Sequence, residues 1–147
     1  MANIQIIVGS VLGASEYVAE ALAEKFEALG HQPSLHFQPN FDDIEQSDFW
    51  LICSSTHGAG DLPDNIQSFA DTLPDKNLNQ LPYCVVSLGD SSYDTFCQGG
   101  EQLYNLMLKA DALPLAKPLE IDVLQHPIPE DYAIEWLSNN TELFESK

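Results

Sequence analysis

Residues 8–16 read Val8-Gly9-Ser10-Val11-Leu12-Gly13-Ala14-Ser15-Glu16 and join an apolar run to an amphipathic pattern. The run before them, Asn3 to Val8, is nearly continuously apolar, as in a strand buried on both faces of a parallel sheet. After them, apolar residues recur at helical spacing: Val18, Leu22, Phe26 and Leu29. We therefore predict a strand, a tight loop and a helix.

This loop has the features of an anion-binding site. A helix N-terminus presents unpaired backbone N–H groups and the positive end of the helix dipole, and small side chains let a phosphate approach them. Ser10 and Ser15 can add hydroxyl donors. Because Gly and Ser also form ordinary strand-to-helix turns, and Ser15 can be a simple N-cap, the loop alone leaves both interpretations open.

The alternation of strand and helix continues along the chain. Phe49–Cys53 and Tyr83–Leu88 are predicted as buried strands, and the proline-bounded Ser34–Phe37 as an edge strand. Prolines also interrupt a last strand within 112–121. Three buried and two edge strands, each followed by a helix, fit the order 2-1-3-4-5. We predict one α/β domain over residues 1–147, a three-layer α/β/α sandwich with a five-stranded parallel sheet.

Long loops follow the three buried strands, at the edge of the sheet where ligands bind in such folds. Aromatic and planar side chains in the second and third loops suit a flat heterocycle held between them: His57, Tyr93 and Phe96. Asp90 and free backbone amides can hydrogen-bond to the polar edge of such a ring. Thr56 can reach either the ring or a phosphate tail.

Composition restricts the classes of function. The 147 residues include 23 acidic and 5 basic side chains, a net charge of −18, which makes nucleic acid an unsuitable partner and a basic protein a suitable one. Repulsion between copies of the chain is the alternative reading of this charge. With 44% hydrophobic residues the chain is not disordered, and its apolar runs fall short of the ~18 residues that a membrane helix needs. The N-terminus has no basic leader, so we expect a cytoplasmic protein.

Cysteines and histidines give no metal or disulfide pattern. Cys53, Cys84 and Cys97 are too few and too scattered for a disulfide framework or a zinc site, and the first two lie in apolar runs typical of a core. The spacing of the other histidines likewise matches no metal site: His31, His36 and His126.

Other classes with a similar fold lack their required residues here. A response regulator needs an acidic pair after the first strand, where this chain has Gly9-Ser10. A P-loop hydrolase needs Lys at the end of its loop, and no Lys precedes Glu24. An oxidoreductase of this fold would add a substrate pocket or an extra domain, for which few residues remain.

The three loops resemble those of the short-chain flavodoxins, and in particular of their MioC-type branch. Residues 9–15 are similar to the family's FMN-phosphate loop, Ser55-Thr56-His57-Gly58 to the loop on the inner flavin face, and Leu88-Gly89-Asp90-Ser91-Ser92-Tyr93 through Phe96-Cys97 to the outer-face loop. The branch is suggested by Asp61-Leu62-Pro63-Asp64-Asn65 and by the tail from Ile128 to Leu137.

This resemblance implies an FMN-bound electron carrier that is not an enzyme. Its implied partners are a flavoprotein reductase as donor and an acceptor enzyme, biotin synthase. From the charge we expect the reductase to have a basic surface, and we expect the chain to act as a monomer. Ser10, Val11, Leu12, Gly13, Ala14 and Ser15 would bind the phosphate, His57 and Tyr93 would cover the two ring faces, and Gly89 and Asp90 would meet the pyrimidine edge. Gly58 would turn its peptide over with the redox state, which glycine tolerates.

Two residues depart from the family's pattern. Leu12 stands where many members have a hydroxyl residue, and His57 stands where many have Trp. The remaining alternative is a flavodoxin-like interaction module that has lost FMN and binds partners only.

Overall fold

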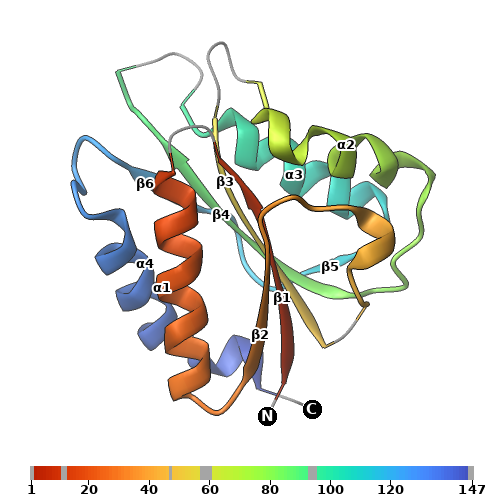
Figure 1. The fold of residues 1–147 in the computed structure, drawn as a ribbon, viewed down its shortest axis with the longest axis horizontal. Helices are drawn as coiled ribbons and strands as arrows, with labels where there is room; N and C mark the ends of the chain where they lie inside the picture. Colours follow the sequence, from red (N-terminus) through yellow and green to blue (C-terminus); the bar gives the residue numbers. More distant parts are fainter. Residues whose placement is uncertain (1, 11–12, 47, 57–60, 93–95, 146–147) are drawn as a thin grey trace.

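The computed structural model describes residues 2–10, 13–46, 48–56, 61–92 and 96–145. Strands and helices alternate along most of it (Figure 1). The strands are β1 (Asn3–Gly9), β2 (Gln32–His36), β3 (Phe49–Ser55), β4 (Pro82–Gly89), β5 (Leu113–Pro114) and β6 (Leu119–Asp122). The helices are α1 (Ala14–Ala28), α2 (Asp64–Thr72), α3 (Gln98–Lys109) and α4 (Pro129–Asn139), with short 3₁₀ turns at Phe41–Asp43, Leu73–Asp75 and Thr141–Phe144.

The sheet is parallel and has the strand order β2-β1-β3-β4-β5, which confirms the predicted 2-1-3-4-5. Both β5 and β6 pair with β4: Leu113 lies opposite Pro82, and Leu119 opposite Val86. The two short strands therefore share the fifth position of the sheet. Pro118 and its neighbours separate them, as expected from proline at a sheet edge.

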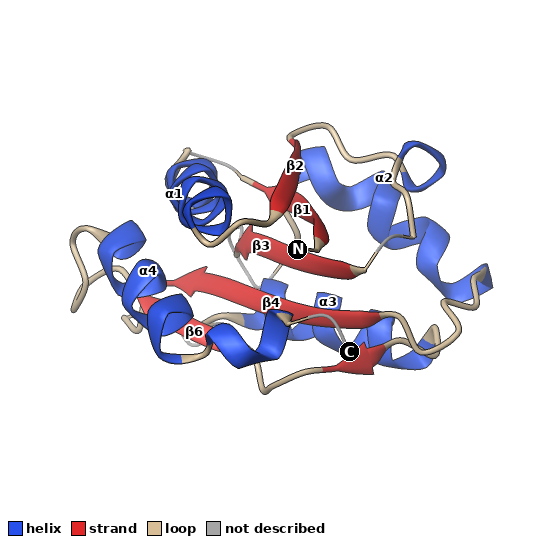
Figure 2. Cartoon of the chain, turned by 90° about the horizontal axis from the view of Figure 1, so that it is seen from below, coloured by secondary structure: helices blue, strands red, loops and turns tan. Residues whose placement is uncertain are grey.

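Helices cover both faces of the sheet (Figure 2). One core packs α1 and α4 against the sheet, and the other packs α2 and α3 against the opposite face. The central strands are buried on both faces, whereas β2 is exposed or half-buried, in agreement with an edge strand. These two cores fix the starts of all four helices relative to the carboxyl edge of the sheet.

The helix predicted after the second strand is wrong: among the described residues between β2 and β3 the chain forms only the 3₁₀ turn Phe41–Asp43. The buried strands are one or two residues longer than predicted, with β1 and β3 ending at Gly9 and Ser55 and β4 spanning Pro82–Gly89.

Other boundaries also differ from the sequence prediction. The strand β2 begins at Gln32, two residues before the predicted Ser34. A 3₁₀ turn, Leu73–Asp75, continues from α2 and contains Pro74. Phe144 lies in another 3₁₀ turn and packs edge-on against Phe26, with the ring centroids 5.0 Å apart.

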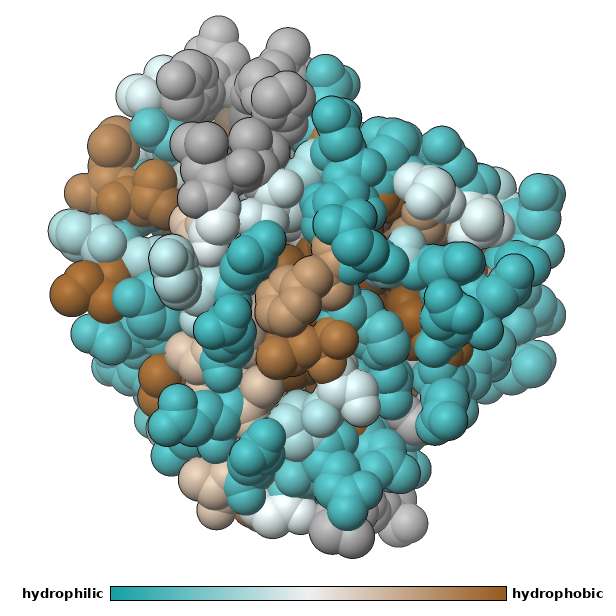
Figure 3. All heavy atoms as spheres, in the orientation of Figure 1, coloured by the Kyte–Doolittle hydropathy of each residue, from teal (hydrophilic) through white to brown (hydrophobic). Residues whose placement is uncertain are grey.

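The surface is mainly polar. On the face shown in Figure 3, hydrophobic residues emerge in separate groups among hydrophilic ones. The large apolar side chains that are exposed come from several elements: Tyr17, Leu29, Leu108, Leu113, Leu124 and Ile128. Within the described residues, no helix is both long enough and apolar enough to cross a membrane.

Candidate functional site

The carboxyl ends of β1, β3, β4 and β6 lie side by side. In the sheet register Gly9 pairs with Ser54, Ser55 with Leu88, and Gly89 with Asp122. Because all strands are parallel, the segments that follow them emerge at one edge (Figure 1). The structure thus brings together the three loops that the sequence analysis selected.

The first loop ends in a helix without a side-chain cap. Gly13 occupies the N-cap position of α1 with φ +91°, a conformation that favours glycine, and as glycine it supplies no side-chain hydrogen bond to the helix start. The hydroxyl oxygen of Ser10 accepts the N–H of Gly13 at 2.9 Å, which folds the loop back on itself. The N–H groups of the first turn of α1, from Ala14 onward, are therefore available to an anion.

Ser15 occupies the first turn of α1 but is fully buried. Its hydroxyl donates to the carbonyl of Gly9 at 2.6 Å, and its own carbonyl accepts the thiol of Cys53 at 3.4 Å. In this arrangement the hydroxyl of Ser15 ties the helix to the end of β1. The group that Ser15 offers to a ligand is its backbone N–H.

The second loop contains a buried hydroxyl that lacks a partner. Among the described side chains, the hydroxyl oxygen of Ser55 is the buried polar atom without a hydrogen bond. Its neighbour Thr56 accepts the N–H of Gly99, at the start of α3, at 3.0 Å. A Cβ at Gly99 would lie 2.8 Å from the carbonyl oxygen of Ser55, so glycine lets α3 approach this loop closely.

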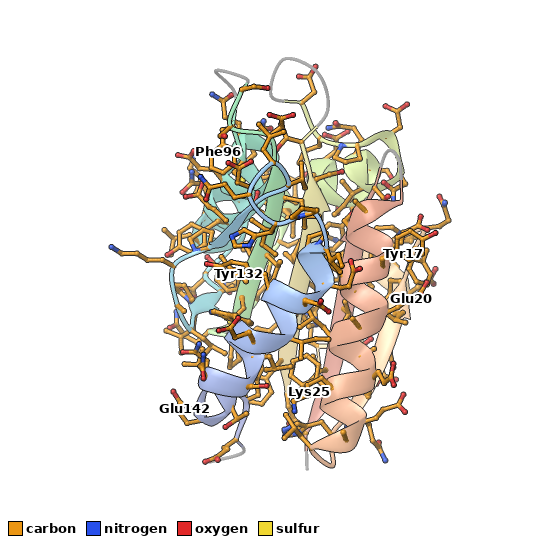
Figure 4. All side chains as sticks on the ribbon, turned by 90° about the vertical axis from the view of Figure 1, so that its left-hand side faces the viewer. Tyr17, Glu20, Lys25, Phe96, Tyr132 and Glu142 are labelled. Carbon is orange, nitrogen blue, oxygen red and sulfur yellow. The ribbon has the colours of Figure 1, made fainter. Side chains whose placement is uncertain are left out.

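The third loop folds tightly back onto the end of β4. A Cβ at Gly89 would lie 2.8 Å from the backbone nitrogen of Cys97 and 3.1 Å from the ring of Phe96. Cys97 itself has φ +57° at the start of α3, and its thiol donates to the carbonyl of Ser87 at 3.5 Å. Burial raises the pKa of this thiol to about 11, so it stays protonated at neutral pH. Figure 4 shows Phe96 toward the end of the molecule at which α1 begins.

Two carboxylates hold the described part of the third loop. Asp90 accepts the N–H of Ser92 at 2.8 Å and its hydroxyl at 2.5 Å, so one oxygen of the predicted ring-edge residue closes a local turn. Asp122 accepts the N–H groups of Ser91 at 3.3 Å and Leu124 at 3.0 Å. The hydrogen bond from the Ser91 hydroxyl is the main cause of a lowered pKa of Asp122, and the two N–H groups add to it, so its carboxylate is favoured.

Several predicted site residues fall outside the described ranges: Val11, Leu12, His57, Gly58 and Tyr93. The others lie at the carboxyl edge: Ser10, Gly13, Ala14, Ser15, Ser55, Thr56, Leu88, Gly89, Asp90, Phe96 and Cys97. Asn65 and Asp122 bind the first and third loops from neighbouring elements but were not among the predicted site residues. A polar residue directly after a loop or strand at this edge is the signal that could have identified them.

The three histidines outside the loops lie apart. Nδ1 of His31 accepts the N–H of Ala2 at 3.0 Å, His36 hydrogen-bonds to Gln5 at 2.6 Å, and the ring of His126 stacks on Tyr132 at 3.9 Å. Among the residues that the structure describes, no three His, Cys, Asp or Glu side chains are grouped so that they could hold a metal ion.

Comparisons with known proteins agree on one family. The family model described as flavodoxin matches residues 6–136. Protein MioC of Escherichia coli K12 is 41% identical over 141 residues, which cover 95% of this chain and 96% of that protein. The solved structure of a cysteine-to-alanine mutant of flavodoxin from Pseudomonas aeruginosa superimposes with a TM-score of 0.91 at 32% identity, covering 98% of this chain and 99% of the other. A Fusobacterium nucleatum flavodoxin bound to flavin mononucleotide shares the fold, with a TM-score of 0.81 at 13% identity, over 99% and 100% of the two chains.

Proposed function

The chain belongs to the flavodoxin family, and on that premise we propose how its residues bind the flavin and with which proteins it exchanges electrons. It is a MioC-type flavodoxin, an electron carrier with FMN as its cofactor and not an enzyme. FMN supplies the redox chemistry, since its ring accepts and releases electrons. The chain's own residues bind the flavin, orient it and control the access of water.

The described residues fit this cofactor. The uncapped start of α1 beside the Ser10 hydroxyl suits a terminal phosphate, and this is the observation on which the proposal mainly rests. The unpartnered hydroxyl of Ser55 supplies a buried hydrogen-bonding group between the first and third loops. The start of α1 is suited to the phosphate of a bound FMN, and the Ser55 hydroxyl is suited to a polar atom of its ring.

We assign the phosphate to residues 10–15, through backbone N–H groups and the Ser10 hydroxyl. The ring would lie between the second and third loops, against Ser55, Thr56, Leu88, Gly89, Asp90, Phe96 and Cys97. Gly89 and Asp90 would meet its polar edge. His57 and Tyr93 as the ring-face residues, and Gly58 as the residue whose peptide turns over, remain proposals from the sequence, because they lie outside the described residues.

The proposed partners follow from charge and from the MioC-type relationship. A net charge of −18 favours association with basic surfaces. We propose a basic-surfaced flavoprotein reductase as donor and an acceptor enzyme, biotin synthase, in the same cytoplasmic compartment, with the chain acting as a monomer. Reduction of the acceptor by the purified donor only when the chain is present would support this pair.

Titration of the apoprotein with FMN and FAD tests the assignment of the phosphate loop. We expect one FMN per chain and much weaker binding of FAD, because a loop that encloses a terminal phosphate leaves no path for a second nucleotide. Ser10→Asp should weaken FMN binding by placing a negative charge against the phosphate. Equal affinity for the two flavins would refute the loop assignment, and a colourless protein that binds neither would instead indicate an interaction module.

A further inference from the structure

The side chain of Asn65, in the first turn of α2, connects three segments that are distant in sequence. Its amide nitrogen donates to the carbonyl of Val8 at 2.8 Å and to the carbonyl of Phe37 at 3.0 Å. Its amide oxygen accepts the backbone N–H of Ser10 at 2.9 Å. Asn65 therefore joins the end of β1, the segment after β2 and the beginning of the first loop.

Only a side-chain amide matches these three partners. The carbonyls of Val8 and Phe37 require a donor, and the N–H of Ser10 requires an acceptor, so the partners also fix which end of the amide is oxygen. An aspartate would keep the bond to Ser10 and lose both donors, and a leucine of similar shape would lose all three hydrogen bonds.

The hydrogen bond between Asn65 and Ser10 also affects the helix that follows the loop. While the Ser10 N–H points to Asn65, the Ser10 hydroxyl oxygen accepts the N–H of Gly13, the N-cap of α1. The helix α2 is also packed closely at this point, since a Cβ at Gly9 would lie 2.9 Å from a methyl group of Ile66. Asn65 thus orients the peptide that determines where the Ser10 hydroxyl and the first N–H groups of α1 lie.

We propose that Asn65 is a positioning residue that holds the first loop in the conformation that binds a phosphate monoester. Asn65 needs no contact with the phosphate for this role, because it acts through Ser10 and Gly13. This inference rests on the proposed FMN binding. In this arrangement a residue of α2, the helix that follows the second loop, keeps the phosphate loop in place.

The test compares FMN with riboflavin, which has the same ring and no phosphate. Apoprotein of the parent and of Asn65→Ala is titrated with each flavin, and flavin fluorescence reports binding. The loss of three hydrogen bonds should reduce FMN affinity by roughly tenfold or more, and riboflavin affinity by less than about twofold. If Asn65→Ala does not fold, Asn65→Ser replaces it with the same expectation.

A matched control and a double variant exclude a general loss of structure. Gln67 lies exposed on the same helix and hydrogen-bonds to Asp71, so Gln67→Ala should leave both affinities unchanged. If Asn65 acts through the position of the Ser10 hydroxyl, Asn65→Ala should reduce FMN affinity less in a Ser10→Ala background than in the parent.

The possible outcomes show separately whether the role of Asn65, the phosphate loop or the proposed function is wrong. An equal loss for both flavins in Asn65→Ala, or no loss, overturns the inference while the function stands. A parent protein that binds FMN no more tightly than riboflavin refutes the assigned phosphate loop, and a parent that binds neither refutes the proposed function. Fully additive losses with Ser10→Ala would overturn the route through the Ser10 hydroxyl.

Discussion

Asp122, the last residue of β6, accepts the backbone N–H of Ser91, 31 residues earlier in the chain, at 3.3 Å. The backbone strengthens this link, since the N–H of Val123 donates to the carbonyl of Gly89 at 2.9 Å. The third loop is therefore fixed at its beginning by the edge strand of the sheet. This contact makes the loop depend on the ionisation of one carboxyl group.

We predict that Asp122→Asn destabilises the protein at neutral pH and that the difference disappears in acid. The pKa of Asp122 is lowered from its ordinary value of 3.8, mainly by the Ser91 hydroxyl, and also by the Leu124 and Ser91 N–H groups and by His126. A lowered pKa in the folded state stabilises the protein above the unfolded value, and this contribution is lost as pH falls through the folded value. Urea unfolding of parent and variant at about pH 6 and about pH 3 measures it. A difference in unfolding free energy that stays constant over this range would contradict the prediction.

Gly89→Ala should destabilise the protein and weaken flavin binding. The added methyl group would lie 2.8 Å from the backbone nitrogen of Cys97 and 2.9 Å from its sulfur, so the start of α3 must shift. Forcing a methyl group into a packed region costs about 1–3 kcal/mol. Chemical denaturation and FMN titration measure the two effects.

Gly30→Asn is the control for Gly89→Ala. Gly30 has a positive φ of 90°, but a Cβ there would meet nothing within 4 Å, and asparagine tolerates this region. We expect little change in flavin affinity. A loss of affinity at Gly30 equal to that at Gly89 would show that the effect is not local to the third loop.

The fold could be predicted from the sequence because its signals are local. Fully apolar runs such as Phe49–Cys53 mark strands buried on both faces, and the prolines around Leu35 and Leu115 mark the edges. These patterns determine which strands are central, and parallel connections then leave few possible strand orders. Boundaries are harder to predict, since the 3₁₀ turn at Leu73–Asp75 depends on packing that the sequence does not display.

The site was predicted less completely, because the hydrogen bonds that position its loops come from segments distant in sequence. The sequence placed Ser15 in the phosphate loop, but it does not show that its hydroxyl is used by the carbonyl of Gly9. The contacts of Asn65 with Phe37 and of Asp122 with Ser91 form only when the strands are aligned. Residue types and spacing identify a loop, whereas the hydrogen bonds that position it require the tertiary structure.

All three cysteine thiols should react slowly in the folded protein. Cys53, Cys84 and Cys97 are buried and free, and burial raises the pKa of Cys84 to about 12 and that of Cys97 to about 11. Because the thiolate is the reactive form, a disulfide reagent at about pH 8 should label none quickly, and all three once the chain is unfolded in denaturant. One thiol that reacts rapidly in the native apoprotein would contradict the close packing around these side chains.

Acidic residues occur in the first turn of every helix, at the carboxyl edge of the sheet, as well as elsewhere on the chain. Each of the four helices begins with acidic residues at the carboxyl edge: Glu16, Asp64, Glu101, Glu130 and Asp131. Lys25 and Lys109 lie in the last turns of α1 and α3, and Figure 4 shows Lys25 toward the far end of α1. This arrangement follows the helix dipole rule and adds negative charge at the edge of the sheet where we propose that the flavin binds.

We therefore predict that reversing acidic residues beside the site slows electron transfer to a basic protein. Asp61 and Asp64 are exposed at the carboxyl edge, and Asp94, which lies outside the described residues, is a third candidate. The single variants Asp61→Lys and Asp64→Lys should each react more slowly with a basic redox protein such as cytochrome c, mainly through slower association. Stopped-flow absorbance measures the rate.

Asp75→Lys provides the control, because Asp75 is exposed near the end of α2 at the opposite edge. Charges are screened beyond ~10 Å at 0.1 M salt, so the difference between the two sites should shrink as salt increases. Rates that respond equally to Asp75→Lys and Asp64→Lys would mean that net charge alone, and not its position around the flavin, governs association.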